Sequence, residues 1–270
     1  MAEHLPDLPP LVPAQYRWGK SETEPHCSQR RGCGSENLLG IQKANVRGQY
    51  DFHLLITLRA LDSLGSLGVS LAALKNGLVD ALLKSRFQHP EIACDVTWDG
   101  SFGPLIQYRP PMHQQDALTW AQETVHVRAT SDTAMDIRKE IVEQHLTKGS
   151  DSWDKPSRSV TVYIIANVAS EHVSLATDTT VEVLFHMNHI YWDGVSARSF
   201  VGDILRDMGP NLGLEHPSQY DWGQEVSNLS IPVLDSLKVD LASLSDQYKT
   251  SVNEFLSTLF RYGVSVLFDL

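Results

Sequence analysis

The chain lacks the features that would place it in three large classes of protein. It has only three cysteines, Cys27, Cys33 and Cys94, and this odd, low number argues against a disulfide framework and fits a reducing compartment. His26 stands beside Cys27, but their spacing to Cys33 does not match a zinc site, so we predict no bound metal. No apolar run approaches the roughly 18 residues that span a bilayer, so we expect no membrane association.

Positive charge is also scarce. The 270 residues carry 22 basic and 33 acidic side chains, a formal net charge of -11, and no basic stripe. This balance argues against sequence-independent binding of nucleic acid. The N-terminus, MAEHLPDLPPLVPAQYRW, has acid and proline where a signal peptide needs basic residues followed by an apolar stretch. We therefore expect a cytoplasmic protein.

The apolar pattern divides the chain into three parts. Residues 1–48 are rich in Pro, Gly, Ser and charge, and they predict an irregular arm with short extended pieces, partly docked on the surface. Residues 49–235 alternate between strand-like and helix-like segments and form the main domain. Residues 236–270 include SVNEFLSTLFRYGVSVLF, whose apolar stripe predicts a helix that must bury one face.

The main domain predicts a mixed α/β fold, a mixed sheet with flanking helices. Ser70 is a candidate N-cap for the first helix, and His89-Pro90 should end it. Asp99-Gly100 indicates a hairpin between two short strands. Strands are predicted at 54–58, 91–98, 104–110, 160–168 and 181–187, and helices at 69–87, 131–146 and 195–208.

One short stretch, LFHMNHIYWDGVSAR, carries the candidate chemistry. His189 stands where a buried strand ends, and a neutral imidazole held by a rigid strand end suits a general base. Gly194 allows the chain to turn into the next helix. We expect Asp193 to lock the loop through a basic partner, with Arg59 and Arg198 as candidates. The alternative is that His189 is an ordinary hydrogen-bonded histidine beside a turn, because the pattern is short.

The stretch HIYWDG, between its strand and helix, resembles the HxxxDG signature of the CoA-dependent acyltransferase superfamily with the chloramphenicol acetyltransferase fold. That superfamily includes plant BAHD acyltransferases, peptide-synthetase condensation domains and fungal trichothecene O-acetyltransferases. SLAALKNGLVDALLKSRFQHPEIACDVTW and PLIQYRPP resemble its first helix and the strands that follow. NHIYWDGVSAR and QYDWGQE are most similar to the trichothecene 15-O-acetyltransferase-like branch. The resemblance covers about residues 50–270 and implies a chloramphenicol acetyltransferase-like half-domain.

Direct acyl transfer is the reaction that this resemblance implies. His189 would take the proton of an acceptor hydroxyl on a secondary metabolite while the oxygen attacks an acyl thioester. Acyl-CoA would be the co-substrate, and no cofactor would be held. Asp193 would be structural, and Gly194 would leave room for the channel.

The residues around the motif are candidates for the pocket. Condensation domains carry a second histidine directly before the catalytic one, and Asn188 stands there instead, which favours O-acyl transfer over peptide-bond formation. His186, Asn188, Tyr191 and Trp192 could line the site. For His186, a core or interface histidine is the more common alternative.

Length separates this chain from the family that it resembles. Members consist of two similar halves with the channel between them, and HxxxDG belongs to the first half. KTSVNEFLSTLFRYGVSVL resembles the opening helix of the second half, whose Asp-Phe-Gly-Trp-Gly signature is absent. We therefore expect a second copy or a partner chain to supply the missing wall. Two other functions stay open: a half-length relative that acts as a small-molecule-binding cyclase or isomerase, and a non-catalytic interaction module or pseudoenzyme.

Overall fold

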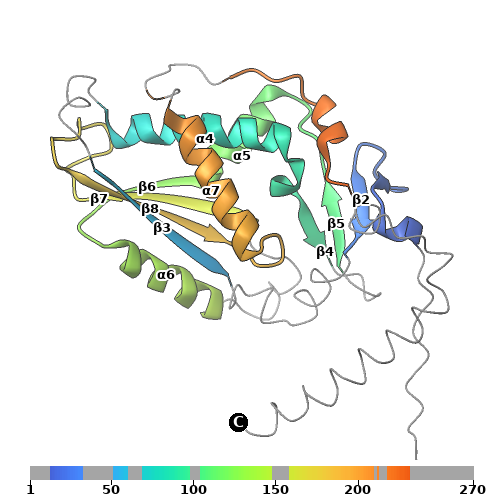
Figure 1. Ribbon diagram of the computed structural model, residues 1–270, viewed down its shortest axis with the longest axis horizontal. Helices are drawn as coiled ribbons and strands as arrows, with labels where there is room; N and C mark the ends of the chain where they lie inside the picture. The colour runs from blue at the N-terminus through green and yellow to red at the C-terminus, as the bar shows by residue number, and fades with distance from the viewer. Residues whose placement is uncertain are drawn as a thin grey trace, which may run out of the picture. The chain divides into compact units, whose positions relative to one another are not determined.

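The structure is a computed structural model (Figure 1). Apart from Ile231, all of the described residues belong to one unit, Met1–Ser230. The helix predicted within 236–270 lies outside the described residues. The structure describes residues 13–32, 51–59, 69–97, 104–147, 158–209, 212 and 218–231, without the side chains of 145–147.

Four strands form the main sheet, in the order β3-β8-β7-β6. Strand β8 pairs antiparallel with both β3 and β7, and β7 runs parallel to β6. Strands β7 and β8 are therefore central, which explains why their sequences are almost continuously apolar. The prediction of these two strands and of β3 is confirmed. The strands are β3 (Phe52–Arg59), β6 (Val125–Ala129), β7 (Val160–Ala166) and β8 (Thr180–Met187).

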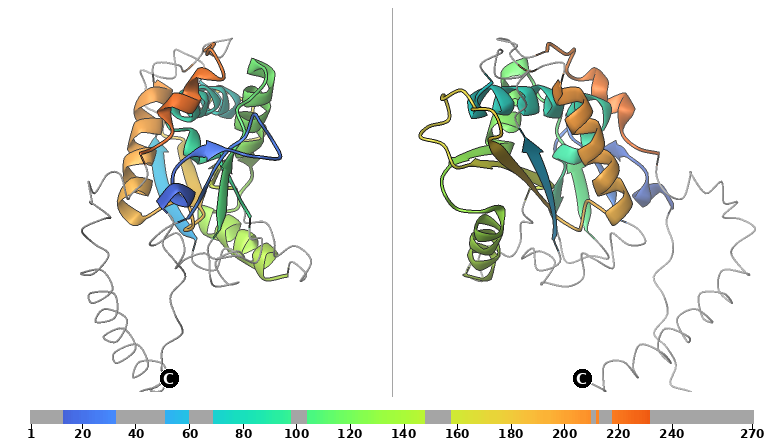
Figure 2. Two further views of the ribbon diagram at one scale, coloured as in Figure 1. Left: turned by 90° about the vertical axis from the view of Figure 1, so that its right-hand side faces the viewer. Right: turned by 60° about the vertical axis from the view of Figure 1, so that its left-hand side comes forward.

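Helices cover both faces of this sheet, as Figures 1 and 2 show. Helices α4 (Leu71–Gln88) and α7 (Gly194–Met208) lie on one face, and α6 (Ala134–Thr147) lies on the other. Phe185 of β8 is buried in the core that includes α4 and α7, whereas its neighbour Leu184 packs with α6. Successive side chains of a strand point to opposite faces, so the sheet contributes to two cores.

Helix α4 forms as its sequence predicts. The Ser70 hydroxyl accepts a hydrogen bond from the amide of Ala73 at 3.2 Å, so Ser70 is the N-cap. The helix ends at Gln88, directly before His89-Pro90. Its buried face includes four leucines at helical spacing, Leu71, Leu74, Leu78 and Leu82.

A second, antiparallel sheet has the order β1-β2-β5-β4. Strands β4 and β5 pair as the predicted hairpin does, although Asp99-Gly100 lies outside the described residues. Strand β2 comes from the predicted N-terminal arm, and its residue Ser28 is buried. Two short pieces of that arm, Gly19–Lys20 and Ser28–Arg31, are thus paired into a sheet. The strands are β1 (Gly19–Lys20), β2 (Ser28–Arg31), β4 (Asp95–Thr97) and β5 (Leu105–Tyr108).

Several elements differ from the prediction. The strand expected at 91–98 is shorter, because Pro90–Ala93 forms the 3-10 helix η2 and pairing begins only at Asp95. Helix α6 begins three residues later than predicted, at Ala134. Helix α5 (Gln114–Thr124) and strand β6 were not predicted at all. The buried residues of α5 are small, so that helix shows no stripe of large apolar side chains.

The segment 218–230 packs across α4 and α5. The amide of Ser218 donates to the buried carboxylate of Asp80, and Trp222 Nε1 donates to Gln114 Oε1 at 2.6 Å. This segment contains the 3-10 helix η5 (Gln224–Asn228), and another, η1 (Pro13–Tyr16), precedes β1. No helix in the described ranges has the length and apolarity needed to cross a membrane.

Candidate functional site

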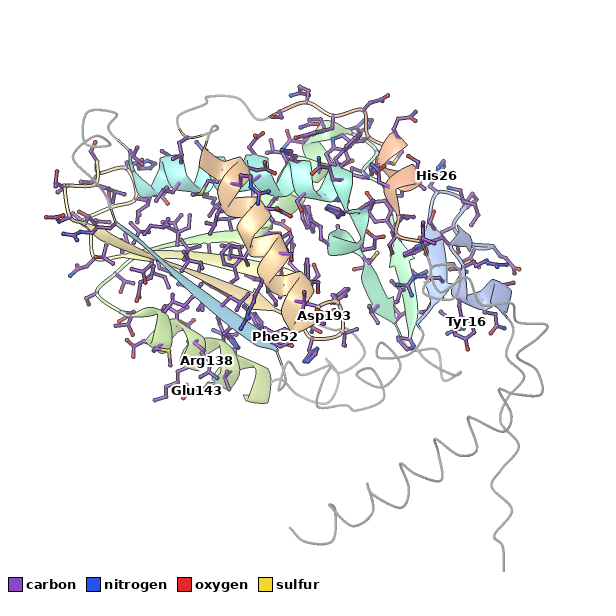
Figure 3. All side chains as sticks on the ribbon, in the orientation of Figure 1. Tyr16, His26, Phe52, Arg138, Glu143 and Asp193 are labelled. Atoms are coloured by element: carbon purple, nitrogen blue, oxygen red, sulfur yellow. The ribbon has the colours of Figure 1, made fainter. Side chains whose placement is uncertain are left out.

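The candidate site is the corner between β8 and α7, residues 188–193. Figure 3 labels Phe52 at the start of β3 and Asp193 at the start of α7, the two element ends that meet here. The carbonyl of Ser159 accepts hydrogen bonds from the Asn188 amide at 3.0 Å and from Trp192 Nε1 at 2.8 Å. Asn188 Oδ1 accepts from the Ile190 amide at 2.9 Å. These bonds hold the corner against the start of β7.

Asp193 is the N-cap of α7. One carboxylate oxygen accepts from the amides of Val195 and Ser196, both at 2.8 Å, and the Asp193 amide donates back to Ser196 Oγ at 3.1 Å. This reciprocal arrangement is a capping box. The backbone hydrogen bond from Ser196 is the main reason why the pKa of Asp193 lies below its usual value, followed by the one from Val195.

This geometry corrects the expected partner of Asp193. The residue does lock the loop, but it does so through backbone amides and not through a basic side chain. Arg59 instead forms an exposed ion pair with Asp178 at 2.7 Å. Within the described ranges no arginine, Arg198 included, pairs with Asp193. A carboxylate at the start of a helix satisfies the free amides there and needs no cation.

His189 lies half-buried, two residues after the end of β8 at Met187. Its ring contacts Phe52, with 4.2 Å between the ring centroids. Its Nδ1 is buried and has no hydrogen-bond partner among the described residues. Within the described ranges no hydrogen bond or ion pair joins its ring to a carboxylate, although the charge of Asp193 interacts with it electrostatically. A neutral imidazole in this position has one ring nitrogen available to accept a proton.

A cavity of about 760 Å³ lies beside the corner. Its walls include Tyr191 and Trp192, two of the four predicted pocket residues. Asn188 is fully buried and His186 almost so, and neither lines any of the three described cavities. His189 is not among the described lining residues of those cavities either. The volume lies in the range of small-molecule sites.

A group that sequence reasoning missed lies under the corner. His186 Nε2 is 2.6 Å from Asp51 Oδ2, and the rings of His186 and His53 stack with their centroids 5.0 Å apart. Burial, then the nearby His186 and Arg138, lower the pKa of His53 to about 4. The signal in the sequence was the polar pair Asp51 and His53 at the start of one strand and a histidine within the last residues of another. The described residues contain no cluster of three or more His, Cys, Asp or Glu side chains suited to a metal ion.

Comparison with known proteins places this chain in a family. The family model described as "15-O-acetyltransferase Tri3" matches residues 8–267. The chain is 44% identical over 266 residues to the trichothecene O-acetyltransferase TRI3 of Trichoderma arundinaceum, over 97% of this chain and 51% of that protein. It is 37% identical over 255 residues to the trichothecene 15-O-acetyltransferase TRI3 of Fusarium sporotrichioides, over 93% of this chain and 48% of that protein.

The fold agrees with the sequence match. The solved structure of TRI3 trichothecene 15-O-acetyltransferase from Fusarium sporotrichioides superposes with a TM-score of 0.82, over 93% of this chain and 49% of that one. The predicted mixed α/β fold and the predicted resemblance are both confirmed. The chain spans about half the length of the relatives that it matches. With a family model matched at residues 8–267 and a shared fold, the chain belongs to the Tri3 15-O-acetyltransferase family.

Proposed function

We propose that this chain takes part in acyl transfer from acyl-CoA to a hydroxyl group of a secondary metabolite, with His189 as the general base. The observation that carries the proposal is the HxxxDG corner of a Tri3-family chain, with His189 two residues after the central strand. The names of the relatives favour an acetyl donor and a trichothecene acceptor. The low cysteine count supports a cytoplasmic location.

The proposed reaction is a direct transfer. His189 accepts the proton of the acceptor hydroxyl while that oxygen attacks the thioester carbonyl carbon, and a tetrahedral oxyanion forms. The carbon–sulfur bond then breaks, and the proton passes from the imidazolium to the sulfur of CoA. The histidine therefore returns to its neutral form after each turnover. The hydrogen-bonded corner supports this role, because a general base must be held in a fixed position.

The cavity beside the corner would hold the apolar body of the acceptor. Its aromatic wall comes from the corner itself, and four of the charged side chains in its lining form two ion pairs. Lys84 pairs with Asp207 at 2.6 Å, and Arg206 pairs with Asp203 at 2.7 Å. Because these charges already have partners, the lining favours an uncharged, hydroxylated molecule over an ionic one.

A second wall for the site belongs to the same proposal. Members of the superfamily hold the channel between two halves, and an acyl thioester in an open site would also be hydrolysed by water. We propose that a second copy or a partner chain contributes that wall. Sedimentation of the purified chain, alone and with acetyl-CoA, measures whether such an assembly forms.

The direct test is turnover of acetyl-CoA and a trichothecene alcohol, followed by release of free CoA thiol. His189→Ala should abolish transfer and leave the circular dichroism spectrum unchanged, whereas the exposed His172→Ala is the matched control. An unchanged rate in His189→Ala would refute the role of His189. Conversion without CoA would favour the cyclase or isomerase, and a stable complex without turnover would favour the interaction module.

A further inference from the structure

Asp51 places a buried carboxylate under the candidate site. Its side chain is 1% exposed and lies directly before β3, opposite the end of β8. The two oxygens have different partners: Oδ2 is 2.6 Å from His186 Nε2, and Oδ1 accepts from the His189 amide at 3.4 Å. One carboxylate thus joins an edge strand to the residue that carries the proposed base.

The pairing of β3 with β8 does not account for this carboxylate. Those strands are joined by backbone hydrogen bonds, and an apolar side chain at 51 would avoid the cost of burying a charge. A buried carboxylate persists only where its partners compensate for lost water. Both partners lie at the end of β8, so they link the carboxylate to the corner and not to the sheet as a whole.

The neighbouring histidines restrict how His186 can move. Its ring stacks on that of His53 with an interplanar angle of 10°. Arg138 faces this pair from α6. Burial first, then His186 and Arg138, lower the pKa of His53 to about 4, so His53 is neutral near pH 7. Stacking on the neutral His53 ring keeps the His186 ring from rotating out of its plane. The His186 ring in turn fixes the position of Asp51 Oδ2.

We propose that Asp51 is a positioning residue for His189: its bond to the His189 amide sets where the imidazole is presented, and His186 holds the carboxylate in place. The contact joins residues 138 positions apart in the chain. This inference rests on the proposed role of His189 as the base. It adds a support that lies outside the HxxxDG motif.

The test compares Asp51→Ala, Asp51→Asn and His186→Gln with a matched control, Asp80→Asn. Asp80 is also a buried carboxylate that accepts from a backbone amide, but that amide belongs to Ser218. The first measurement is the pH titration of the His189 ring signals by NMR, assigned by their loss in His189→Gln. The second measurement is the kcat and the KM for acetyl-CoA of each variant.

In Asp51→Ala we expect displaced His189 ring signals with a shifted titration midpoint. We also expect kcat to fall by about 10- to 100-fold while KM stays within about twofold, because a misplaced base affects chemistry more than binding. Asp51→Asn keeps an acceptor oxygen and should lose less. It also keeps the test decisive if the alanine variant does not fold, because it is nearly isosteric.

The two measurements separate this inference from the proposed function. Wild-type ring signals and midpoint in folded Asp51→Asn and His186→Gln would overturn the positioning role. A fall in kcat no larger than that of Asp80→Asn would overturn it too. If His189→Ala retains turnover, the proposed function fails, but displaced His189 signals in the Asp51 variants would still establish the positioning contact.

Discussion

Replacement of Asp193 by alanine tests how the candidate site is built. The change removes the carboxylate that accepts from two amides in the first turn of α7, each at 2.8 Å. Loss of such an N-cap typically costs about 0.5–2 kcal/mol. Asp193 is exposed, so water takes over part of the lost bonding, and α7 keeps its buried face of Phe200 and Ile204. We expect the free energy of unfolding to fall by about 1 kcal/mol.

The effect should depend on pH in a direction that the structure sets. The backbone hydrogen bonds lower the pKa of Asp193 below the usual 3.8. A carboxylate with a lowered pKa stabilises the fold above its unfolded pKa, and this contribution is lost as the pH falls through the folded pKa. The wild type and Asp193→Ala should therefore differ fully at pH 7, begin to converge near pH 4, and converge fully only below the lowered folded pKa. Asp193→Asn still accepts from the amides, and we expect it to lose less than Asp193→Ala at pH 7.

Thermal unfolding and urea titration measure this difference. A loss of about 1 kcal/mol corresponds to a Tm about 2–4 °C lower for a domain of this size. Arg198→Ala is the control, because a cap needs no cation and should leave Tm unchanged. The reasoning would be refuted if Arg198→Ala lowered Tm as much as Asp193→Ala and the double variant lost no more. That result would mean that an ion pair holds the loop.

Three further changes probe the parts of the fold around the site. His53 has a pKa of about 4 in the folded chain, against 6.5 in a model peptide. As the pH drops from 6.5 to about 4, the unfolded state therefore binds a proton that the folded state does not, and the free energy of unfolding falls. In urea titrations over that pH range, the free energy of unfolding of His53→Gln should fall by on the order of 1 kcal/mol less than that of the wild type. Identical pH profiles for the two proteins would contradict this. Tyr108→Phe removes the hydroxyl that donates to the fully buried Glu225 at 2.8 Å. The Gly223 amide still donates to the other carboxylate oxygen, Oε2. The change should cost about 1–3 kcal/mol in urea unfolding, and a loss near zero would show that another group replaces the hydroxyl at Oε1. Phe185→Ala empties a fully buried position beneath α4 and α7. It should cost about 3–5 kcal/mol by the same assay, and a much smaller loss would mean that the core closes over the space.

The parts of the fold that could be predicted are those with a strong local pattern. Helix α4 has both its N-cap residue Ser70 and a stripe of leucines, and β7 and β8 are apolar on both faces. Helix α5 escaped prediction because its buried residues are Ala117, Ala121 and Thr124, none of them a large apolar side chain. Its start carried a readable signal, since Asp116 accepts from the amide of His113 at 2.9 Å in a capping box.

The corner shows the same division between local and distant information. The cap of α7 was readable from the spacing of Asp193 and Ser196, which fits a capping box, although we expected an arginine instead. The contact between Asp51 and His189 was not readable, because it depends on the register that sets β3 against β8 across more than a hundred residues. A one-residue slip in that register would turn Asp51 to the other face.

Three separate elements therefore fix the position of His189, and the loss of each should have a different effect. The central strand β8 fixes the backbone up to Met187, the cap at Asp193 fixes it after the turn, and the Asp51 carboxylate reaches the amide of His189 itself. The cap is exposed, so its loss should cost stability at the helix start and leave the core intact. Asp51 is buried against His186, so its loss should act on the imidazole more than on the fold. If variants at both sites lowered stability equally and left the ring of His189 unmoved, the corner would be a structural turn and not a device for presenting a base.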